Sequence, residues 1–315
     1  MPKSNILFVK SPLNYIGGKY KILNQIVPIF PNDINNFIDL FTGGGNVAVN
    51  VKAQKIFMND NLIYLIDLYK LFYELRYNKI LEYIYNRIEE YKLSDDNADG
   101  YNKLRDEYNT NRKPLDLFVL VSYSFNHQIR FNNNHQFNNP FGKYRSSFNN
   151  SIKNNLENFI HRMQSLNIDF SNNNFECFNF NFLKENDFIY CDPPYLISTG
   201  TYNDGKRGFT GWNSNNEIML LKILDDLNKR NIKFALSNFL IHNGQINSIL
   251  KEWISYNNYN VTKIDSNYNN SCYNKKILAQ TKTIEVLVTN YKTDFSCIDI
   301  NTDDKNLFFN MEYNL

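Results

Sequence analysis

The chain has 315 residues, of which 43% are hydrophobic and 21% charged, and its formal net charge is +2. This composition excludes a disordered, collagen-like or coiled-coil protein, and the length predicts one large domain or two moderate ones. The near-neutral balance excludes a protein whose whole surface is polycationic. A nucleic-acid partner is not excluded, because a binding face needs only local charge.

The four cysteines and the hydrophobic pattern predict the setting in which the protein works. No two cysteines form a CxxC pair or share metal-ligand spacing with the four histidines, so we expect a reducing, cytoplasmic setting and no metal site. The first ten residues lack a signal-peptide pattern, and no apolar run reaches about 18 residues, so we expect no membrane association. We also expect a monomer in solution.

The first half of the chain begins with strand signals and continues with helical spacing. Residues 36 to 41 predict a strand, residues 42 to 45 a tight glycine loop, residues 46 to 53 a helix and residues 55 to 58 a second strand. The apolar residues from 62 to 91 follow helical spacing, which predicts two or more helices. Residues 126 to 150 keep neither period for long, so a hairpin or ordered loop is expected there.

The second half of the chain resumes the alternation of helices and strands. A helix is predicted near residues 152 to 166, strands at 188 to 191, 234 to 237 and 283 to 289, and another helix at 216 to 231. Strands that alternate with helices predict an α/β fold with a parallel, doubly wound sheet and one inserted segment.

The sharpest motif is Asp192-Pro193-Pro194-Tyr195, directly after the apolar run that ends at Cys191. Open α/β sheets bind ligands at the carboxyl ends of their strands, so the motif places a carboxylate at the expected site. The prolines fix the backbone and lack N–H groups, which leaves carbonyl oxygens to accept hydrogen bonds. Together with the tyrosine ring, these groups suit the exocyclic amine of a planar base. The alternative is a turn with an incidental aspartate.

A second motif is the glycine loop that follows Asp39-Leu40-Phe41. Glycines at 43 to 45 let the backbone approach a ligand closely, and the helix expected next would offer free N–H groups. The loop matches neither the GxGxxG fingerprint nor the Walker motif. Asp60, at the end of the next strand, is placed to accept hydrogen bonds from ribose hydroxyls. A surface position or a helix cap is the alternative for Asp60.

A third motif, Tyr15-Ile16-Gly17-Gly18-Lys19, lies near the start of the chain. The tyrosine ring can cover a ligand, and the lysine can pair with a carboxylate. The alternative is that the paired glycines and the lysine only cap the next helix.

In their order, SPLNYIGGK, FIDLFTGGGN, Asp60 and YCDPPY resemble the Dam-type DNA adenine methyltransferases of the alpha group. The resemblance runs from about residue 11 to residue 291 and implies a Rossmann-like sheet that binds S-adenosylmethionine. We therefore expect residues 1–64 and 157–315 to form a discontinuous catalytic domain. Residues 65–156 are expected to form an inserted, mostly helical target-recognition domain that carries a β-hairpin.

The resemblance also implies the roles of individual residues. The residues expected to bind the cofactor are Tyr15, Gly17, Gly18, Lys19, Asp39, Phe41, Gly43, Gly45, Asp60 and Asp192. The catalytic residues are expected to be Asp192, Pro193, Pro194 and Tyr195. Tyr15 stands where the best-known members have tryptophan, and residues 196 to 212 depart from the family pattern, so no roles are transferred to that loop.

The segment between Asp116 and Glu157 contains no acidic residue and four basic ones. The net charge of +2 is therefore the sum of a basic inserted segment and a slightly acidic remainder of the chain. Part of this segment resembles the DNA-reading hairpin of the family. We therefore expect double-stranded DNA as a partner, because such a patch suits phosphates and its amides suit base edges. The expected contacts are Asn126, Arg130, Asn132, Gln136, Lys143, Tyr144 and Arg145. A solvated loop is the alternative.

The function implied is methyl transfer from S-adenosylmethionine to the N6 amine of an adenine that is flipped out of duplex DNA at a short sequence. A restriction endonuclease that acts on the same site is a candidate partner. Three alternatives stay open. Cytosine-N4 methylation usually goes with serine at position 192, and methylation of a protein amide usually goes with asparagine there. The third alternative is an inactive DNA-binding specificity module.

Overall fold

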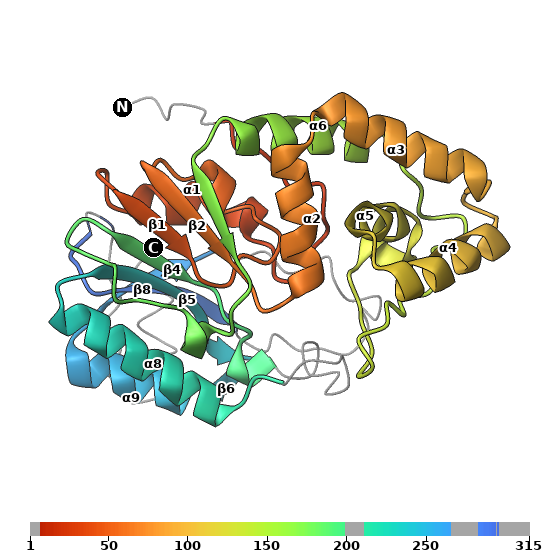
Figure 1. The fold of residues 1–315 in the computed structure, drawn as a ribbon. Coiled ribbons are helices and arrows are strands. Elements are labelled where there is room, and N and C mark those ends of the chain that lie inside the picture. Colours follow the sequence, from red (N-terminus) through yellow and green to blue (C-terminus); the bar gives the residue numbers. More distant parts are fainter. Residues whose placement is uncertain (1–6, 199–210, 266–282, 294, 296–315) are drawn as a thin grey trace.

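The computed structural model describes residues 7–198, 211–265, 283–293 and 295. Its centre is one sheet with the strand order β3-β2-β1-β4-β5-β8-β7, and the short β6 pairs with β5 (Figure 1). The strands are β1 (Asn36–Asp39), β2 (Lys55–Asn59), β3 (Ile168–Ser171), β4 (Phe188–Cys191), β5 (Lys233–His242), β6 (Gln245–Ile246), β7 (Asn260–Ile264) and β8 (Ile284–Thr289).

The strands from β3 to β5 in the sheet run parallel to one another. The chain moves from β1 outward to β2 and β3, and then returns to β4 on the other side of β1. The strand order therefore reverses between β1 and β4. Ligands of open α/β sheets bind in the crevice at such a reversal, and here Asp39 ends β1 while Asp192 follows β4.

The prediction of a wholly parallel sheet is wrong at one edge. Strand β8 was expected from the sequence, but it runs antiparallel to both β5 and β7. An apolar run that is buried on both faces fits either direction, because direction depends on the connections to the neighbouring strands.

The helices flank this sheet and extend beyond it. They are α1 (Leu23–Ile26), α2 (Ile63–Glu74), α3 (Tyr77–Glu90), α4 (Ala98–Asn111), α5 (Pro114–Tyr123), α6 (Asn150–Gln164), α8 (Ser214–Lys229) and α9 (Ser248–Asn257). Helices α3, α4 and α5 lie to the side of the sheet (Figure 1). Among the described residues, no helix is long and apolar enough to cross a membrane.

Two buried cores follow from the alternation of side chains along the strands. Phe37 of β1 joins the core that contains residues of α1, α2 and α6, whereas its neighbour Ile38 joins the core that contains residues of α8 and α9. Successive strand residues point to opposite faces, so each apolar strand supplies both cores.

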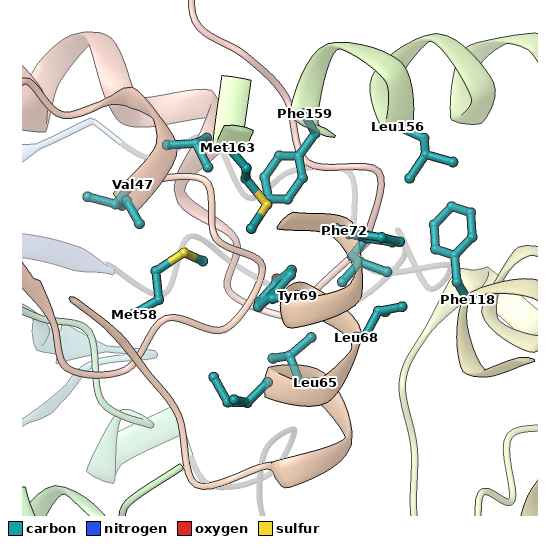
Figure 2. Packing of buried hydrophobic residues seen from close by; sticks show 14 of the residues in the cluster. Val47, Met58, Leu65, Leu68, Tyr69, Phe72, Phe118, Leu156, Phe159 and Met163 are labelled. Carbon is teal, nitrogen blue, oxygen red and sulfur yellow. The ribbon is translucent and has the colours of Figure 1, made fainter. Parts of the chain in front are cut away.

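Helix α2 connects the sheet to the helices beside it. Its Tyr69 packs on Phe159 of α6 with ring centroids 6.0 Å apart, and its Phe72 packs edge-on against Phe118 of α5 at 5.5 Å. One buried core therefore continues from Met58 of the sheet into the neighbouring helices (Figure 2). The division of the chain at residues 65 and 156 stays a prediction.

Asparagine side chains start several of the helices. Asn97, Asn149, Asn213 and Asn247 are the N-cap residues of α4, α6, α8 and α9, and each side chain accepts a backbone N–H of the first turn. Such caps satisfy amide groups that have no partner within the helix.

The helix predicted at residues 46 to 53 is wrong. That segment contains one 3₁₀ turn, Ala48–Asn50, before the chain extends again at Val51. Two causes act against a helix here: several residues are β-branched, and the Asn50 side chain bonds both to the backbone of Val9 and to the carbonyl oxygen of Asn46.

Candidate active site

A cavity of about 600 Å³ lies where the strand order reverses. The residues that line it come from segments far apart in the sequence, including the start of the chain, the glycine loop and the residues after β4. The predicted site residues among them are Tyr15, Gly17, Gly18, Lys19, Asp39, Phe41, Gly43, Asp60, Asp192, Pro193, Pro194 and Tyr195. Gly45 was also predicted to bind the cofactor, but it does not line the cavity.

Asp60 fixes the glycine loop to the start of α2. Its Oδ2 accepts the Gly43 N–H at 2.9 Å, and its Oδ1 accepts the Leu62 N–H at 2.9 Å, just before the helix. Burial raises the pKa of the Asp60 carboxyl, and these two N–H groups oppose that effect. Asp60 is buried and is not the N-cap of α2, which is Leu62 and has no side-chain cap, so neither alternative for Asp60 holds. Contact with a ribose stays a prediction.

Gly43 and Gly45 both adopt left-handed backbone angles, with φ of +46° and +72°. A Cβ on Gly43 would lie 3.0 Å from the Tyr15 ring, so this ring covers the loop on the cavity side. A Cβ on Gly45 would instead meet Phe159 at 3.0 Å and Met58 at 3.3 Å, inside the core. Gly45 thus lets the core pack against the back of the loop.

We expect Gly45→Ala to lower the free energy of unfolding by about 3 kcal/mol, because it adds backbone strain and a clash with Phe159. Gly244→Ala is the matched control: Gly244 has φ of +79°, but a Cβ there meets nothing within 4 Å. That control should lose about 1 kcal/mol. Urea unfolding measures both, and equal losses would contradict the packing role given to Gly45.

Asp39 presents an unpaired carboxylate at the cavity. It is 1% exposed, and neither of its carboxylate oxygens has a hydrogen-bond partner among the described residues. Burial raises the pKa of its carboxyl well above the ordinary value, and the nearby Asp192 adds to this. A buried acid of this kind is suited to a ligand that carries a positive charge or several N–H donors.

Three aromatic rings border another part of the cavity. Phe41, Phe175 and Trp212 lie with ring centroids 5.3 to 5.7 Å apart, and the Trp212 indole donates a hydrogen bond to Glu217 at 2.7 Å. Rings held in this way suit a planar ligand group. Of the three, the sequence prediction included only Phe41, because no local motif surrounds Phe175 or Trp212.

Lys19, Asp192 and Tyr195 form a buried polar cluster. The Lys19 Nζ lies 2.8 Å from Asp192 Oδ1 and donates to the carbonyl oxygen of Gly17 at 3.0 Å, so the lysine does pair with a carboxylate. The Tyr195 hydroxyl donates to the same Asp192 oxygen at 3.0 Å. Burial raises the pKa of the Asp192 carboxyl, and the Lys19 charge opposes this.

One residue of this cluster was missed by sequence reasoning. Glu285 of β8 lies with Oε1 2.9 Å from the Tyr195 hydroxyl and 3.7 Å from the Lys19 Nζ. It lies 90 residues from Tyr195 in the chain and inside an apolar run, so no motif indicates that the two meet.

The segment predicted to read DNA does reverse direction, but without regular strands. Isolated antiparallel bridges join Phe131 to Phe137 and Ser124 to Phe141. Asn126, His127, His135 and Tyr144 have left-handed backbone angles, which interrupt a regular ladder. The expected β-hairpin is thus present only as a folded-back loop. The side chains predicted to contact DNA are all exposed except the half-buried Asn132, and they are Asn126, Arg130, Asn132, Gln136, Lys143, Tyr144 and Arg145.

Aromatic stacking fixes this loop beside the cavity. Phe131 stacks on Tyr64 of α2 with ring centroids 4.5 Å apart, and the guanidinium of Arg112 lies 5.2 Å from the Tyr64 ring. His135, at the turn of the loop, lines the cavity. The Asn14 side chain donates to the carbonyl oxygen of Asn126 at 2.8 Å, so the loop also contacts the segment that carries Tyr15.

Residues 15–270 match the D12 class of N6 adenine-specific DNA methyltransferases. The chain belongs to this family. The matched range includes every described residue that lines the cavity, from Tyr15 to Asn216, and it ends before Glu285.

Two relatives of this D12 chain are modification enzymes. It is 50% identical over 286 residues to the modification methylase StsI of Streptococcus sanguinis and 48% identical over 284 residues to the type II methyltransferase M.FokI of Planomicrobium okeanokoites. These matches cover 91% and 90% of the chain but only 43% of either relative, so the chain spans less than half of their length.

A shorter relative matches the D12 chain over most of both lengths. A DNA adenine methylase of Haemophilus influenzae is 30% identical over 245 residues, which make up 73% of this chain and 78% of the relative.

Proposed function

We propose that this chain transfers a methyl group from S-adenosylmethionine to the N6 amine of an adenine in a short duplex DNA sequence. Family membership supports the reaction class. The observation that carries the proposal is that Asp192, in its Asp-Pro-Pro-Tyr context, shares one cavity with the glycine loop and the unpaired Asp39.

The residues of the cavity fit S-adenosylmethionine. Asp39 would hold a positively charged group of the cofactor, because its buried carboxylate has no described partner. The rings of Phe41, Phe175 and Trp212 would take the planar adenine, and Asp60 the ribose. Bound there, the cofactor supplies a methyl group that is electrophilic because its sulfur is a sulfonium.

Asp192 and Pro193 act on the target amine in this proposal. The N6 lone pair of adenine is delocalised into its ring, so the amine is a poor nucleophile. Lys19 and Tyr195 both bond Asp192 Oδ1, and no described residue bonds Oδ2. That oxygen and the Pro193 carbonyl would accept hydrogen bonds from the two N–H groups of the amine, localise the lone pair on nitrogen and align it for attack. Asp192 would then take the proton that the nitrogen loses once it is methylated.

Tyr195 holds the target base. Its ring lines the cavity and is fixed at the hydroxyl end by hydrogen bonds. An adenine inside a duplex cannot reach this cavity, so the base must leave the stack and lie against a ring such as this one.

The loop from residue 124 to 145 is proposed to bind the duplex around the flipped base. Stacking of Phe131 on Tyr64 fixes it, while Arg130, Lys143 and Arg145 are exposed. No acidic residue occurs between Asp116 and Glu157, so phosphates would meet no repulsion from this segment. The recognition role of the inserted helices is part of the same proposal.

We expect Arg130→Ala and Lys143→Ala to have different effects on DNA binding. If Arg130 reads a base edge, its loss should relax discrimination at one position by about 1–3 kcal/mol. If Lys143 contacts phosphate, its loss should weaken binding to every sequence and lower the salt slope by about one. Titrations at several salt concentrations measure both, with Lys229→Ala on α8 as the control. Unchanged affinity and specificity in both variants would contradict the placement of DNA on this loop.

The names of the relatives support a biological role for the reaction. Two of them are a modification methylase and a type II methyltransferase. We propose that methylation by this chain protects a short sequence against a restriction endonuclease that cuts it.

Methyl transfer to DNA tests the proposed function. The purified chain is incubated with duplex DNA and S-adenosylmethionine that is labelled in the methyl group, and the DNA is then digested to nucleosides. The label is expected in N6-methyladenine. Label in N4-methylcytosine would overturn the adenine assignment, and an unlabelled digest would overturn the function as a whole.

A further inference from the structure

Glu285 is an acidic residue in a strand whose neighbouring residues are apolar. It lies in β8 between Ile284 and Val286, in a strand whose residues are all buried, and is 1% exposed. A buried carboxylate without partners would be costly, so its presence requires groups that compensate its charge. It does not line the cavity and lies outside the range matched by the family.

Among the described residues, the groups that compensate this charge belong to the catalytic cluster. The Tyr195 hydroxyl donates to Glu285 Oε1 at 2.9 Å, and the Lys19 Nζ lies 3.7 Å from the same oxygen. On the cavity side, the same hydroxyl and the same ammonium group contact Asp192 at 3.0 and 2.8 Å. Glu285 and Asp192 therefore share the Tyr195 hydroxyl and the Lys19 ammonium group as partners.

These contacts determine where the Tyr195 ring can lie. Its hydroxyl has one proton to donate and two carboxylate oxygens within hydrogen-bond distance, so whichever of them accepts it, the hydroxyl end stays beside Glu285 and Asp192. The Phe239 ring packs against the Tyr195 ring at 4.5 Å with an interplanar angle of 69°, and the Lys19 Nζ lies 5.0 Å from its centroid. Without Glu285, the hydroxyl would lose one of its two described acceptors, and the ring could tilt away from its present orientation at the cavity.

We propose that Glu285 is a positioning residue for methyl transfer, which acts through the Tyr195 hydroxyl to hold the tyrosine ring in the orientation that stacks on the target base. This inference rests on the proposed function, because it assigns Tyr195 to the base. It extends the active site to a strand that the motif pattern does not reach.

A series of variants tests this role by single-turnover methyl transfer. Glu285→Ala should lower the rate about 100-fold, because a small displacement of a positioned group has effects of that size. Glu285→Gln keeps an oxygen that accepts from Tyr195 and should stay within about fivefold of the wild type. The dissociation constant for S-adenosylmethionine should change less than about threefold in both, since Glu285 does not line the cavity.

Two further variants separate this role from a structural one. In a Tyr195→Phe background, Glu285→Ala should lower the methyl-transfer rate by less than a further factor of about three, because the hydroxyl through which Glu285 acts is already gone. Asp225→Asn is the matched control: Asp225 of α8 also accepts a tyrosine hydroxyl, from Tyr259 at 3.0 Å, but lies outside the cavity. It should leave the rate unchanged.

These experiments distinguish a failure of the role proposed for Glu285 from a failure of the proposed methyltransferase function. If the wild type transfers no methyl group to DNA, the proposed function fails, and this role of Glu285 fails with it. If the wild type is active and the effects of Glu285→Ala and Tyr195→Phe multiply in the double variant, or Glu285→Ala keeps the full rate, only the positioning role is overturned. Should Glu285→Ala not fold, the comparison of Glu285→Gln in the two backgrounds decides.

Discussion

Asp192→Ala is expected to lower the rate of methyl transfer by at least about 1,000-fold, the loss typical of removing a charge-aligned hydrogen-bonding group. The side chain lies at the carboxyl end of β4, and its Oδ2 is the acceptor proposed for the target amine. Without it, the amine lone pair stays delocalised, and the Pro193 carbonyl alone must orient the base. Specific DNA binding should largely survive, because the proposed DNA-binding loop is a separate segment.

Single-turnover transfer and DNA titration, run on the same preparations, test this prediction. Asp192→Asn provides the graded control, since an amide oxygen can accept one amine hydrogen but carries no charge. Its rate should lie between those of the wild type and Asp192→Ala. A variant Asp192→Ala with near-normal turnover would show that another group accepts the amine hydrogens, and the proposed mechanism would be wrong.

Lys19→Met is expected to lower the free energy of unfolding by about 3–5 kcal/mol, the usual effect of removing one partner of a buried ion pair. Lys19 is 4% exposed and lies 2.8 Å from Asp192 and 3.7 Å from Glu285, so its loss removes the cation that the described structure places beside these two carboxylates. Methionine fills a similar volume, which limits the loss from packing.

The loss in Lys19→Met should depend on pH in a defined direction. Burial already raises the pKa of Asp192, and removal of the Lys19 charge that opposes this raises it further. A carboxyl whose pKa is higher in the folded than in the unfolded protein does not destabilise the fold at low pH, where it is protonated. Stability is lost as the pH rises through the pKa of the folded protein, because the buried carboxyl must then ionise. The gap between variant and wild type should therefore widen as the pH rises from acidic to neutral.

Urea unfolding at several pH values measures this gap. Lys229→Met is the control, because Lys229 is an exposed lysine that pairs with Asp226 on the surface of α8, where ion pairs contribute little. A constant gap across the pH range would indicate that Lys19 stabilises the fold by packing and not by its charge.

Local sequence was enough to single out three segments of the cavity. The rule that ligands bind at the carboxyl ends of strands indicated the Asp-Pro-Pro-Tyr motif, the glycine loop followed from its composition, and the family resemblance added the Tyr15 to Lys19 segment. The structure brings them into one cavity. The strand predicted at residues 188 to 191 is confirmed as β4.

The parts that depend on distant contacts could not be predicted in this way. Strands β3 and β7 are only four and five residues long, too short for an alternation to show, and neighbouring elements cover them. Helix α9 was also missed, although its apolar residues follow helical spacing. Glu285 and Trp212 reach the site through pairings between segments far apart in the chain, which no spacing of residues encodes. The direction of β8 has the same origin.

The segment after the glycine loop was predicted as a helix, but contacts with distant residues give it another structure. The residues from 46 to 53 lie where a crossover helix is expected between two parallel strands, yet they form one short turn. The Asn50 side chain donates to the Asn46 carbonyl oxygen, the acceptor that the Asn50 N–H would use in a helix. The same side chain is held by the backbone of Val9, a residue that only the folded structure brings near.

The proposed function is methylation of adenine N6 at one short DNA sequence. It can be tested by expressing the chain in a host that lacks DNA methylation and mapping the modified bases across the genome at base resolution. We expect N6-methyladenine at nearly every copy of one short sequence, and unmodified DNA when Asp192→Ala is expressed instead. N4-methylcytosine, or a genome that stays unmodified although the wild-type chain is folded, would contradict it.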